Sequence, residues 1–172
     1  NQFAMMAKTY GCEYQEVYRI MTTGYSRNKQ LPRAGFAAGP CLLKDTLQLS
    51  DFYGNTFFLG QAAMNINEGY PLFIVENYLR KYSLPELTIG ILGMSFKPEV
   101  DDIRDSLSFR LKKILEARGA KVVCSDEFYK QDDWLDSNDL INKSNIIIVA
   151  VPHSQYDKLD FKNKEVIHAW SK

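Results

Sequence analysis

Apolar residues in the first part of the chain recur at helical spacing. Residues 1–10 and 13–21 carry apolar side chains three and four positions apart, which predicts two short helices. Residues 24–41 contain three glycines and two prolines, too many breaks for a regular element. We therefore predict a helical pair followed by an irregular loop.

A longer helical pattern follows this loop. It runs from about residue 45 to residue 82. Gly69 and Pro71 lie inside it, and proline lacks the amide hydrogen that a helix interior uses. We expect the helix to be kinked or divided at these two residues.

The second half of the chain alternates between strand and helix patterns. We predict one helix with an apolar stripe that includes Leu107 and Leu111 and ends at Gly119, and another over residues 132–140. Four apolar runs have the length of buried strands: residues 88–94, 121–125, 146–151 and 165–169. This order is typical of a parallel sheet with right-handed crossovers.

These patterns together predict an α/β protein with two parts. A helical region over residues 1–84 precedes a parallel-sheet domain over residues 85–172, and Ser83 and Pro85 interrupt the pattern at the boundary. Doubly wound sheets of this kind bind ligands at the carboxyl ends of their strands.

Composition limits the class of partner. The chain has 21 basic and 21 acidic residues, so its formal charge of zero gives no support for a nucleic acid or an anionic membrane as a partner. Apolar residues make up 45% and charged residues 24%, which excludes a disordered chain. The longest strongly apolar run, residues 146–151, is too short to cross a bilayer.

The cysteines indicate a reducing environment. Cys12, Cys41 and Cys124 cannot all pair with one another, and they lack the C-x-x-C spacing of a zinc ribbon or a dithiol redox motif. We therefore predict free thiols, no metal site and a cytoplasmic protein. The chain also begins inside a helical pattern without an initiator methionine, so we expect a piece of a longer chain.

The first loop with candidate chemistry leads to Cys41, followed by Lys44 and Asp45. If a helix starts near Cys41, the thiol lies at the positive end of the dipole, and helix N-termini and cations lower the pKa of a thiol. This arrangement suits attack on a carbonyl, with Lys44 stabilising charge and Asp45 acting as a base or orienting water. The alternative is a cysteine that only packs.

Small residues before the cysteine would let a ligand approach the backbone closely. We assign substrate contacts to Gly35, Phe36 and Gly39 of this segment.

The second loop, residues 93–106, follows a buried strand and precedes a helix. Lys97 and Arg104 bring two cations to a place where free amides favour phosphate. In the alternative interpretation the loop is only a charged surface, with Arg104 paired to Asp101 or Asp105. Either Asp105 or Ser106 caps the helix.

These two loops, in this order, resemble motifs of the UDP-glucose/GDP-mannose dehydrogenase family, the nucleotide-sugar 6-dehydrogenases. The first resembles the family's glycine-rich segment ending in C-x-x-K-D, and the second its F-K-x-x-x-D-D-x-R-x-S motif. Weaker matches are Asn67 and His153. The resemblance spans nearly the whole chain but covers only the central helical and the C-terminal Rossmann-like parts of such enzymes, because a G-x-G-x-x-G after a strand is missing.

The resemblance implies an NAD-dependent oxidation of a sugar C6 alcohol to a carboxylate, with UDP-glucose as the favoured substrate. Cys41 would form a thiohemiacetal and then a thioester, and Asp45 would assist water. The resemblance also implies that Lys97 contacts the substrate, that Arg104 lies near the cofactor pyrophosphate and that Arg27 reaches a neighbouring subunit's sugar site.

Three hypotheses follow. The first is a fragment of such a dehydrogenase, a homodimer through its central helices, which we expect to be inactive alone because it cannot position a hydride acceptor. The second is a nucleotide-binding or dimerisation module without chemistry. The third, a thiol hydrolase, needs His153 or His168 beside Cys41. The dimer is expected because residues 56–82 carry more apolar surface than one helical stripe needs. Alternatively, this surface packs against the sheet domain or against a missing domain.

Overall fold

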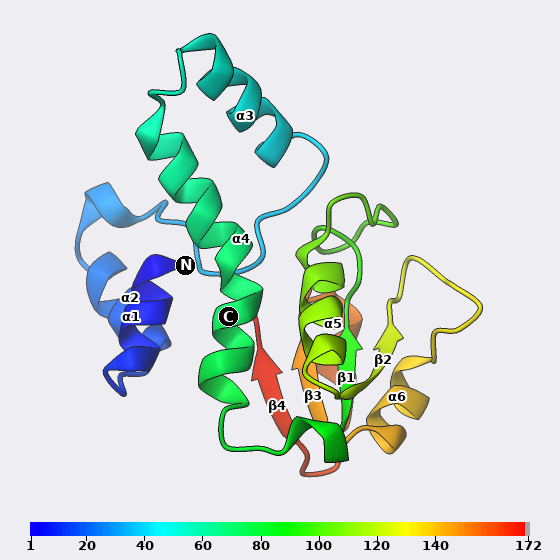
Figure 1. Ribbon diagram of the computed structural model, residues 1–172. Coiled ribbons are helices and arrows are strands. Elements are labelled where there is room, and N and C mark those ends of the chain that lie inside the picture. Colours follow the sequence, from blue (N-terminus) through cyan, green and yellow to red (C-terminus); the bar gives the residue numbers. More distant parts are fainter. Residues whose placement is uncertain (171–172) are drawn as a thin grey trace.

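A computed structural model describes residues 1–170 of the chain. It confirms the mixed α/β class: within these residues the helical elements dominate the first half and the strands lie in the second (Figure 1). The helices are α1 (Gln2–Thr9), α2 (Tyr14–Thr22), α3 (Leu42–Phe52), α4 (Phe58–Tyr78), α5 (Leu107–Ala117) and α6 (Ser137–Lys143). The strands are β1 (Thr88–Leu92), β2 (Lys121–Ser125), β3 (Ile146–Val149) and β4 (Glu165–His168).

The long helical pattern is divided at a different place from the one predicted. Helix α4 continues through Gly69 and Pro71. The helical pattern is instead interrupted between α3 and α4, where Gly54 and Asn55 both have a φ of 59°. Pro71 is buried, and packing of α4 against α5 compensates for the backbone hydrogen bond that a proline removes. The predicted division at Gly69 and Pro71 is therefore wrong.

Capping residues decide where the helices of the second half begin. Helix α5 begins after Ser106, whose hydroxyl accepts a hydrogen bond from the Ser108 amide, and Gly119 follows its end with a φ of +87°. Helix α6 begins only at Ser137, because the Asp136 carboxylate accepts from the Asp139 amide at 2.8 Å. The helix predicted from residue 132 onward is thus too early by five residues.

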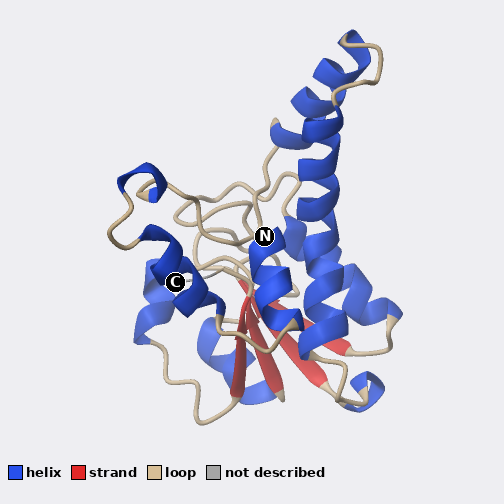
Figure 2. Cartoon of the chain, turned by 90° about the vertical axis from the view of Figure 1, so that its left-hand side faces the viewer, coloured by secondary structure: helices blue, strands red, loops and turns tan. Residues whose placement is uncertain are grey.

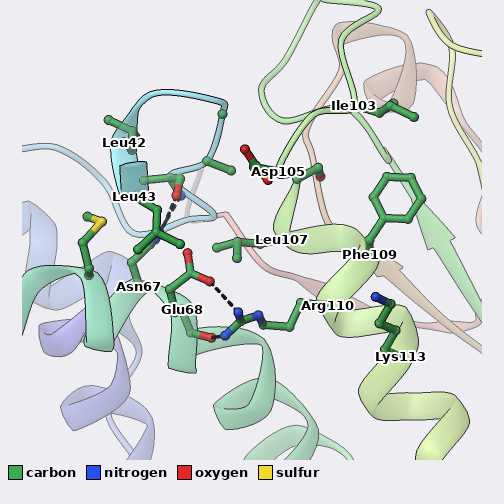
Figure 3. A pocket seen from close by; sticks show the side chains of 15 residues that line it. Leu42, Leu43, Asn67, Glu68, Ile103, Asp105, Leu107, Phe109, Arg110 and Lys113 are labelled. Carbon is green, nitrogen blue, oxygen red and sulfur yellow. Dashed lines mark hydrogen bonds and ion pairs between the residues drawn. The ribbon is translucent and has the colours of Figure 1, made fainter. Parts of the chain in front are cut away.

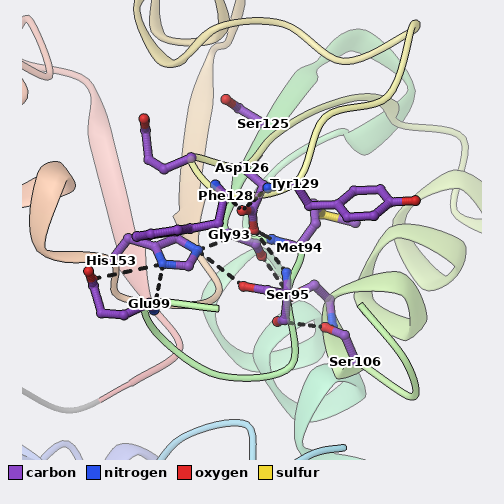
Figure 4. A network of polar contacts seen from close by, with 12 residues as sticks. Gly93, Met94, Ser95, Glu99, Ser106, Ser125, Asp126, Phe128, Tyr129 and His153 are labelled. Carbon is purple, nitrogen blue, oxygen red and sulfur yellow. Dashed lines mark hydrogen bonds and ion pairs between the residues drawn. The ribbon is translucent and has the colours of Figure 1, made fainter. Parts of the chain in front are cut away.

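The four strands form a parallel sheet in the order β2-β1-β3-β4. The chain proceeds from β1 to one neighbour and then crosses to the other, so the direction of winding reverses between β1 and β3. In doubly wound sheets, ligands bind in the crevice at such a switch point, beyond the carboxyl ends of the strands. The loops that follow β1, β2 and β3 meet at this end of the sheet (Figures 1 and 4).

Successive residues of the central strands point to opposite faces, and each face is covered by helices. Ile89 and Ile91 pack with α4 and α5, while Leu92 packs with α6 on the opposite face. Gly90 allows α6 to approach closely, since a Cβ atom there would lie 2.5 Å from the Leu140 side chain. Both faces of the sheet are therefore core, as the uninterrupted apolar runs predict.

Helix α3 and the N-terminal half of α4 project beyond the sheet as a helical hairpin (Figures 1 and 2). Several of its large apolar side chains are exposed: Leu47, Leu49, Phe52, Tyr53, Phe58 and Leu59. Among the described residues, no helix has both the length and the apolar character needed to span a bilayer.

Candidate functional site

The two loops singled out in the sequence lie against each other. We call residues 35–41 the cysteine loop and residues 93–106 the lysine loop. Gly39 of the cysteine loop has a φ of +121°, and a Cβ atom there would lie 3.0 Å from the Phe96 ring of the lysine loop. Only glycine accommodates both the backbone angle and this contact.

A cavity of about 450 Å³ opens beside this contact, between the start of α3, helix α4 and the start of α5 (Figure 3). Its volume is within the range of small-molecule sites. Its wall combines apolar side chains such as Leu43 and Leu107 with the polar groups of Glu68, Asp105 and Arg110. This mixture suits a ligand with both a polar and an apolar part.

Asn67 of α4 fixes the cysteine loop to the helix. Its side-chain amide donates to the carbonyl of Ala37, and its Oδ1 accepts from the amide of the same residue at 3.2 Å. Asn1 extends this arrangement, since it donates to Asn67 and accepts from the Gly35 amide at 2.8 Å. Because Asn67 is buried, these bonds are protected from water and set the path of the loop.

Cys41 occupies the N-cap position of α3, and its carbonyl accepts from the Asp45 amide at 2.8 Å. The expectation that a helix starts at this cysteine is confirmed. The thiol is exposed, and Lys44 and Asp45 form an ion pair with each other at 3.2 Å. Both side chains of that pair are more than half exposed, so the pair itself adds little stability.

Arg104 of the lysine loop pairs with Asp102 rather than with Asp101 or Asp105. Its Nε and Nη2 groups contact both carboxylate oxygens of Asp102, the shortest distance being 2.6 Å. Hydrogen bonds from Arg104 hold the pKa of the Asp102 carboxyl below its usual range. The same carboxylate raises the pKa of Arg104, and Cys41 adds a smaller electrostatic contribution of the same sign.

The other predicted site residues have different surroundings. Lys97 is exposed, with its Nζ 5.4 Å from the centroid of the Phe96 ring. Phe36 is 1% exposed and packs edge-to-face on Tyr70, so its side chain belongs to the core and does not line the cavity.

Gly35 and Arg27 also lie away from the cavity wall. Gly35 is covered by the Trp170 ring, which a Cβ atom would approach to 2.3 Å. Arg27 is exposed in the short 3-10 helix Ser26–Asn28 and is not among the residues that line the cavity.

Two cationic residues of the cavity wall were missed by the sequence reasoning. Arg110 forms an ion pair with Glu68 of α4 at 2.9 Å and donates to the Glu68 carbonyl at 3.2 Å, and Lys113 lies one turn further along α5 (Figure 3). The sequence did contain a signal for this pair. The two cations are three positions apart and begin four residues after the predicted cap, so they lie on one face of the helix.

A buried polar network lies behind the lysine loop, at the carboxyl ends of the first three strands (Figure 4). Asp126, directly after β2, is 1% exposed. One carboxylate oxygen accepts from the Met94 and Ser95 amides at 2.6 and 2.9 Å, and the other from the Phe128 and Tyr129 amides at 2.9 and 3.1 Å. Asp126 was also missed, although a carboxylate directly after a parallel strand was a usable signal.

His153, in the loop after β3, is the side-chain partner of Asp126. Its Nε2 lies 3.2 Å from an Asp126 oxygen, and its Nδ1 accepts from the Glu99 amide at 3.1 Å. Burial would raise the pKa of Asp126, but hydrogen bonds from His153 and the backbone amides outweigh burial and hold it far below its usual value. Both His153 nitrogens are engaged in this network, so His153 is not available to activate Cys41 as the thiol-hydrolase hypothesis requires.

Other potential chemistry in the described part of the chain is limited. No group of three or more histidine, cysteine or acidic side chains within residues 1–170 is arranged to hold a metal ion. Cys124 is buried in the sheet, and burial raises the pKa of its thiol to about 12. This cysteine is therefore a packing residue, as its strand position predicts.

The parallel sheet, its switch point and the loops that gather there define a Rossmann-like α/β protein. Residues 90–169 match the model of the UDP-glucose/GDP-mannose dehydrogenase family, UDP binding domain. Over these residues the chain is similar to that domain, which confirms the resemblance inferred from the sequence for this part.

Curated relatives extend the similarity over almost the whole chain. A UDP-glucose 6-dehydrogenase of Haloferax volcanii is 28% identical over 93% of this chain, and a UDP-N-acetyl-D-mannosamine dehydrogenase of Methanocaldococcus jannaschii is 27% identical over 95%. The chain covers only 40% and 39% of these two relatives, respectively.

Solved structures agree with this relationship. A UDP-glucose dehydrogenase from Pyrobaculum islandicum superposes with a TM-score of 0.79 at 25% identity, over 99% of this chain and 43% of that one. The structure of a UDP-D-ManNAc dehydrogenase from Pyrococcus horikoshii gives a TM-score of 0.81 at 23% identity, over 97% of this chain and 41% of its own. Because of its lower identity, the match to the Pyrococcus horikoshii structure supports only the fold of this chain.

Proposed function

We propose that this chain is the substrate-binding and nucleophile-bearing part of an NAD-dependent nucleotide-sugar 6-dehydrogenase, with UDP-glucose as the favoured sugar. The observation that carries the proposal is the contact of the cysteine loop with the lysine loop at Gly39 and Phe96, beside a cavity of about 450 Å³. Two loops about sixty residues apart in sequence, each with a motif that resembles the family's, lie against each other there, while Cys41, Lys97 and Arg104 are not among the residues that line the cavity.

Cys41 is the proposed nucleophile. Its thiolate would attack the C6 aldehyde of the sugar, forming a C–S bond, and a proton would add to the carbonyl oxygen to give a thiohemiacetal. Loss of a hydride from C6 and of the hydroxyl proton would convert the thiohemiacetal to a thioester. Water, oriented by Asp45, would then add to the thioester carbonyl and break the C–S bond. The water would supply the second carboxylate oxygen, and its two protons would pass to solvent as the carboxylate and the thiolate are released. The exposed thiol at the start of α3 and the nearby Arg104 and Lys44 cations support this role.

When it is bound, NAD would accept the hydride twice: in the preceding oxidation of the C6 alcohol to the aldehyde, and in the oxidation of the thiohemiacetal. Within the described residues, Arg104 is the proposed contact to its pyrophosphate. The side chain is 70% exposed, and Asp102 occupies only the edge formed by Nε and Nη2. The remaining Nη1 group is able to donate to a phosphate oxygen, so the residue fits this role.

We also infer the two-part division proposed from the sequence, with a dimerisation region over residues 1–84 and a nucleotide-sugar-binding domain over residues 85–172. The exposed apolar side chains of the projecting hairpin, such as Phe52 at 86% and Leu59 at 80%, support a homodimer through this region. Arg27, which is exposed, remains the proposed contact to a partner's sugar site.

Replacing Lys97 with alanine is expected to weaken UDP-glucose binding about tenfold, because a charge-assisted hydrogen bond contributes roughly 1.5–3 kcal/mol. Calorimetry on the 172-residue chain measures the dissociation constant for UDP-glucose, UDP-N-acetyl sugars and GDP-mannose. Lys121→Ala, at the opposite end of the sheet, is the matched control and should bind as the unaltered chain does. Equal affinity of the two variants would contradict the assignment of Lys97.

Alkylation separates a dehydrogenase part from a binding module without chemistry. With iodoacetamide at neutral pH, Cys41 is expected to react several times faster than Cys12, because it is the proposed nucleophile and lies exposed at the N-cap of α3. Cys124 is expected to stay unmodified, since it is buried and its thiol pKa is raised to about 12. Mass spectrometry of tryptic peptides gives the three rates. Equal rates for Cys41 and Cys12 would favour the second hypothesis.

A further inference from the structure

The buried network behind the lysine loop contacts the backbone at Lys97 and two residues after it. The Ser95 hydroxyl donates to the Lys97 carbonyl at 3.1 Å. The Glu99 amide donates to His153 Nδ1 at 3.1 Å. Glu99 has a φ of +61°, a left-handed conformation that a non-glycine residue adopts only when its surroundings hold it there.

The hydrogen bonds assign the protonation state of His153. Because the Glu99 amide donates to Nδ1, that nitrogen carries a lone pair, and the proton of the neutral ring is on Nε2. Nε2 lies 3.2 Å from Asp126 Oδ2 and 3.2 Å from Ser95 Oγ, whose own proton is directed to the Lys97 carbonyl. The imidazole thus links the Asp126 carboxylate to the lysine loop through both of its nitrogens.

This arrangement is not a hydrolytic triad. Ser95 is 0% exposed, and both Ser95 and Asp126 contact the same ring nitrogen, whereas a triad places them on opposite nitrogens. The rings of Phe128 and Tyr156 enclose His153, with centroids 5.0 and 5.3 Å away. The network therefore has no access to a substrate and acts on the loop in front of it.

We propose that His153 is a positioning residue for nucleotide-sugar binding: its neutral Nε2–H form ties the backbone around Lys97 to the Asp126 carboxylate. Its side chain joins the loops that follow β1, β2 and β3, so the position of the Lys97 backbone depends on the switch point of the sheet. The inference has a structural half, the hydrogen bonding of His153, and a functional half, its effect on binding. The functional half rests on the proposed function, because it requires that Lys97 bind the nucleotide sugar.

A double-mutant cycle tests the functional half. UDP-glucose affinity is measured by calorimetry for the unaltered chain, Lys97→Ala, His153→Phe and the double variant. We expect about a tenfold loss for each single variant and no further loss for the double variant, because residues that act through one another are not additive. His153→Gln is expected to recover binding to within about threefold, since its amide offers one acceptor and one donor for Glu99 and Asp126. His168→Phe, the other histidine, is the control and should bind normally.

Each outcome has a distinct meaning. If Lys97→Ala weakens binding and His153→Phe does not, or if the double variant shows the product of the two losses, the inference on His153 is overturned and the proposed function stands. If Lys97→Ala has no effect, or the unaltered chain binds no nucleotide sugar, the proposed function fails, and the inference fails with it.

Nitrogen NMR tests the structural half without any ligand and without relying on a variant that folds. The ¹⁵N shifts of the His153 ring are expected to report a protonated Nε2 and an unprotonated Nδ1. The Glu99 amide is expected to exchange slowly with solvent. A protonated Nδ1 or a rapidly exchanging Glu99 amide would overturn the positioning role.

Discussion

Replacing Gly93 with alanine is expected to destabilise the sheet by about 3–5 kcal/mol, a large part of the stability of a typical domain. Gly93 directly follows β1 and has a φ of +89°. A Cβ atom there would lie 2.5 Å from the Val151 carbonyl oxygen and 2.7 Å from the Val151 amide nitrogen. The backbone after β3 would have to move, and no side-chain rotation relieves the overlap.

Urea denaturation followed by circular dichroism measures this effect. Gly69→Ala is the matched control, because Gly69 lies inside α4 and a Cβ atom there meets nothing within 4 Å. That variant is expected to be equal to the unaltered chain or more stable by up to about 1 kcal/mol, since alanine favours a helix over glycine. A Gly93→Ala midpoint within error of the unaltered chain would show that β1 and β3 do not meet in this way.

Replacing Asp126 with asparagine is expected to lower the free energy of unfolding by about 3–5 kcal/mol, the usual cost of removing one partner from a buried charged network. Each carboxylate oxygen of Asp126 accepts from two backbone amides. Asparagine replaces one of these oxygens with an NH₂ group, which would face two N–H donors whichever way the side chain is turned.

The same residue predicts how stability changes with pH. The pKa of Asp126 is depressed in the folded state, whereas in the unfolded chain we expect about 3.9. A depressed folded-state pKa stabilises the protein above the unfolded-state value, and this contribution is lost as the pH falls below about 4. Asp126→Asn should therefore flatten the acid limb of the stability curve.

Chemical denaturation at a series of pH values from neutral to about 3 measures both effects. The control is Asp132→Asn, an exposed aspartate in the same loop, which is expected to change stability by less than about 0.5 kcal/mol. If Asp126→Asn resembled that control at neutral pH, the network at the switch point would have no energetic importance.

Local patterns in the sequence were sufficient for the strands and for α5 of the second half, whereas α6 begins five residues later than they predict. Strands that are buried on both faces read as continuous apolar runs, and the β1, β2 and β3 runs were found from that property. The stripe with Leu111 and the left-handed Gly119 gave the extent of α5. The division of the long helical pattern was missed, because packing of Pro71 into the core outweighs a local preference against proline.

The candidate site was predictable only in part. Cys41, Lys44, Asp45, Lys97 and Arg104 were proposed because their spacing resembles family motifs, yet spacing gives no information about which side chain is buried. Phe36 lies in a segment that resembles a substrate loop, but its ring fills the core against Tyr70. The choice of Asp102 as the partner of Arg104 depends on the turn of the loop, which brings both nitrogens onto one carboxylate.

The sequence by itself determined the α/β class, the order of the strands along the chain and the two loops that carry chemistry, because these depend on periodicity and spacing between near neighbours. Only the tertiary structure decided which distant residues meet. Asp126 and His153 are 27 positions apart, and Glu99 and His153 are 54 apart. The parallel sheet brings them together because its strands all end at the same edge, where backbone amides and one carboxylate satisfy one another out of reach of water.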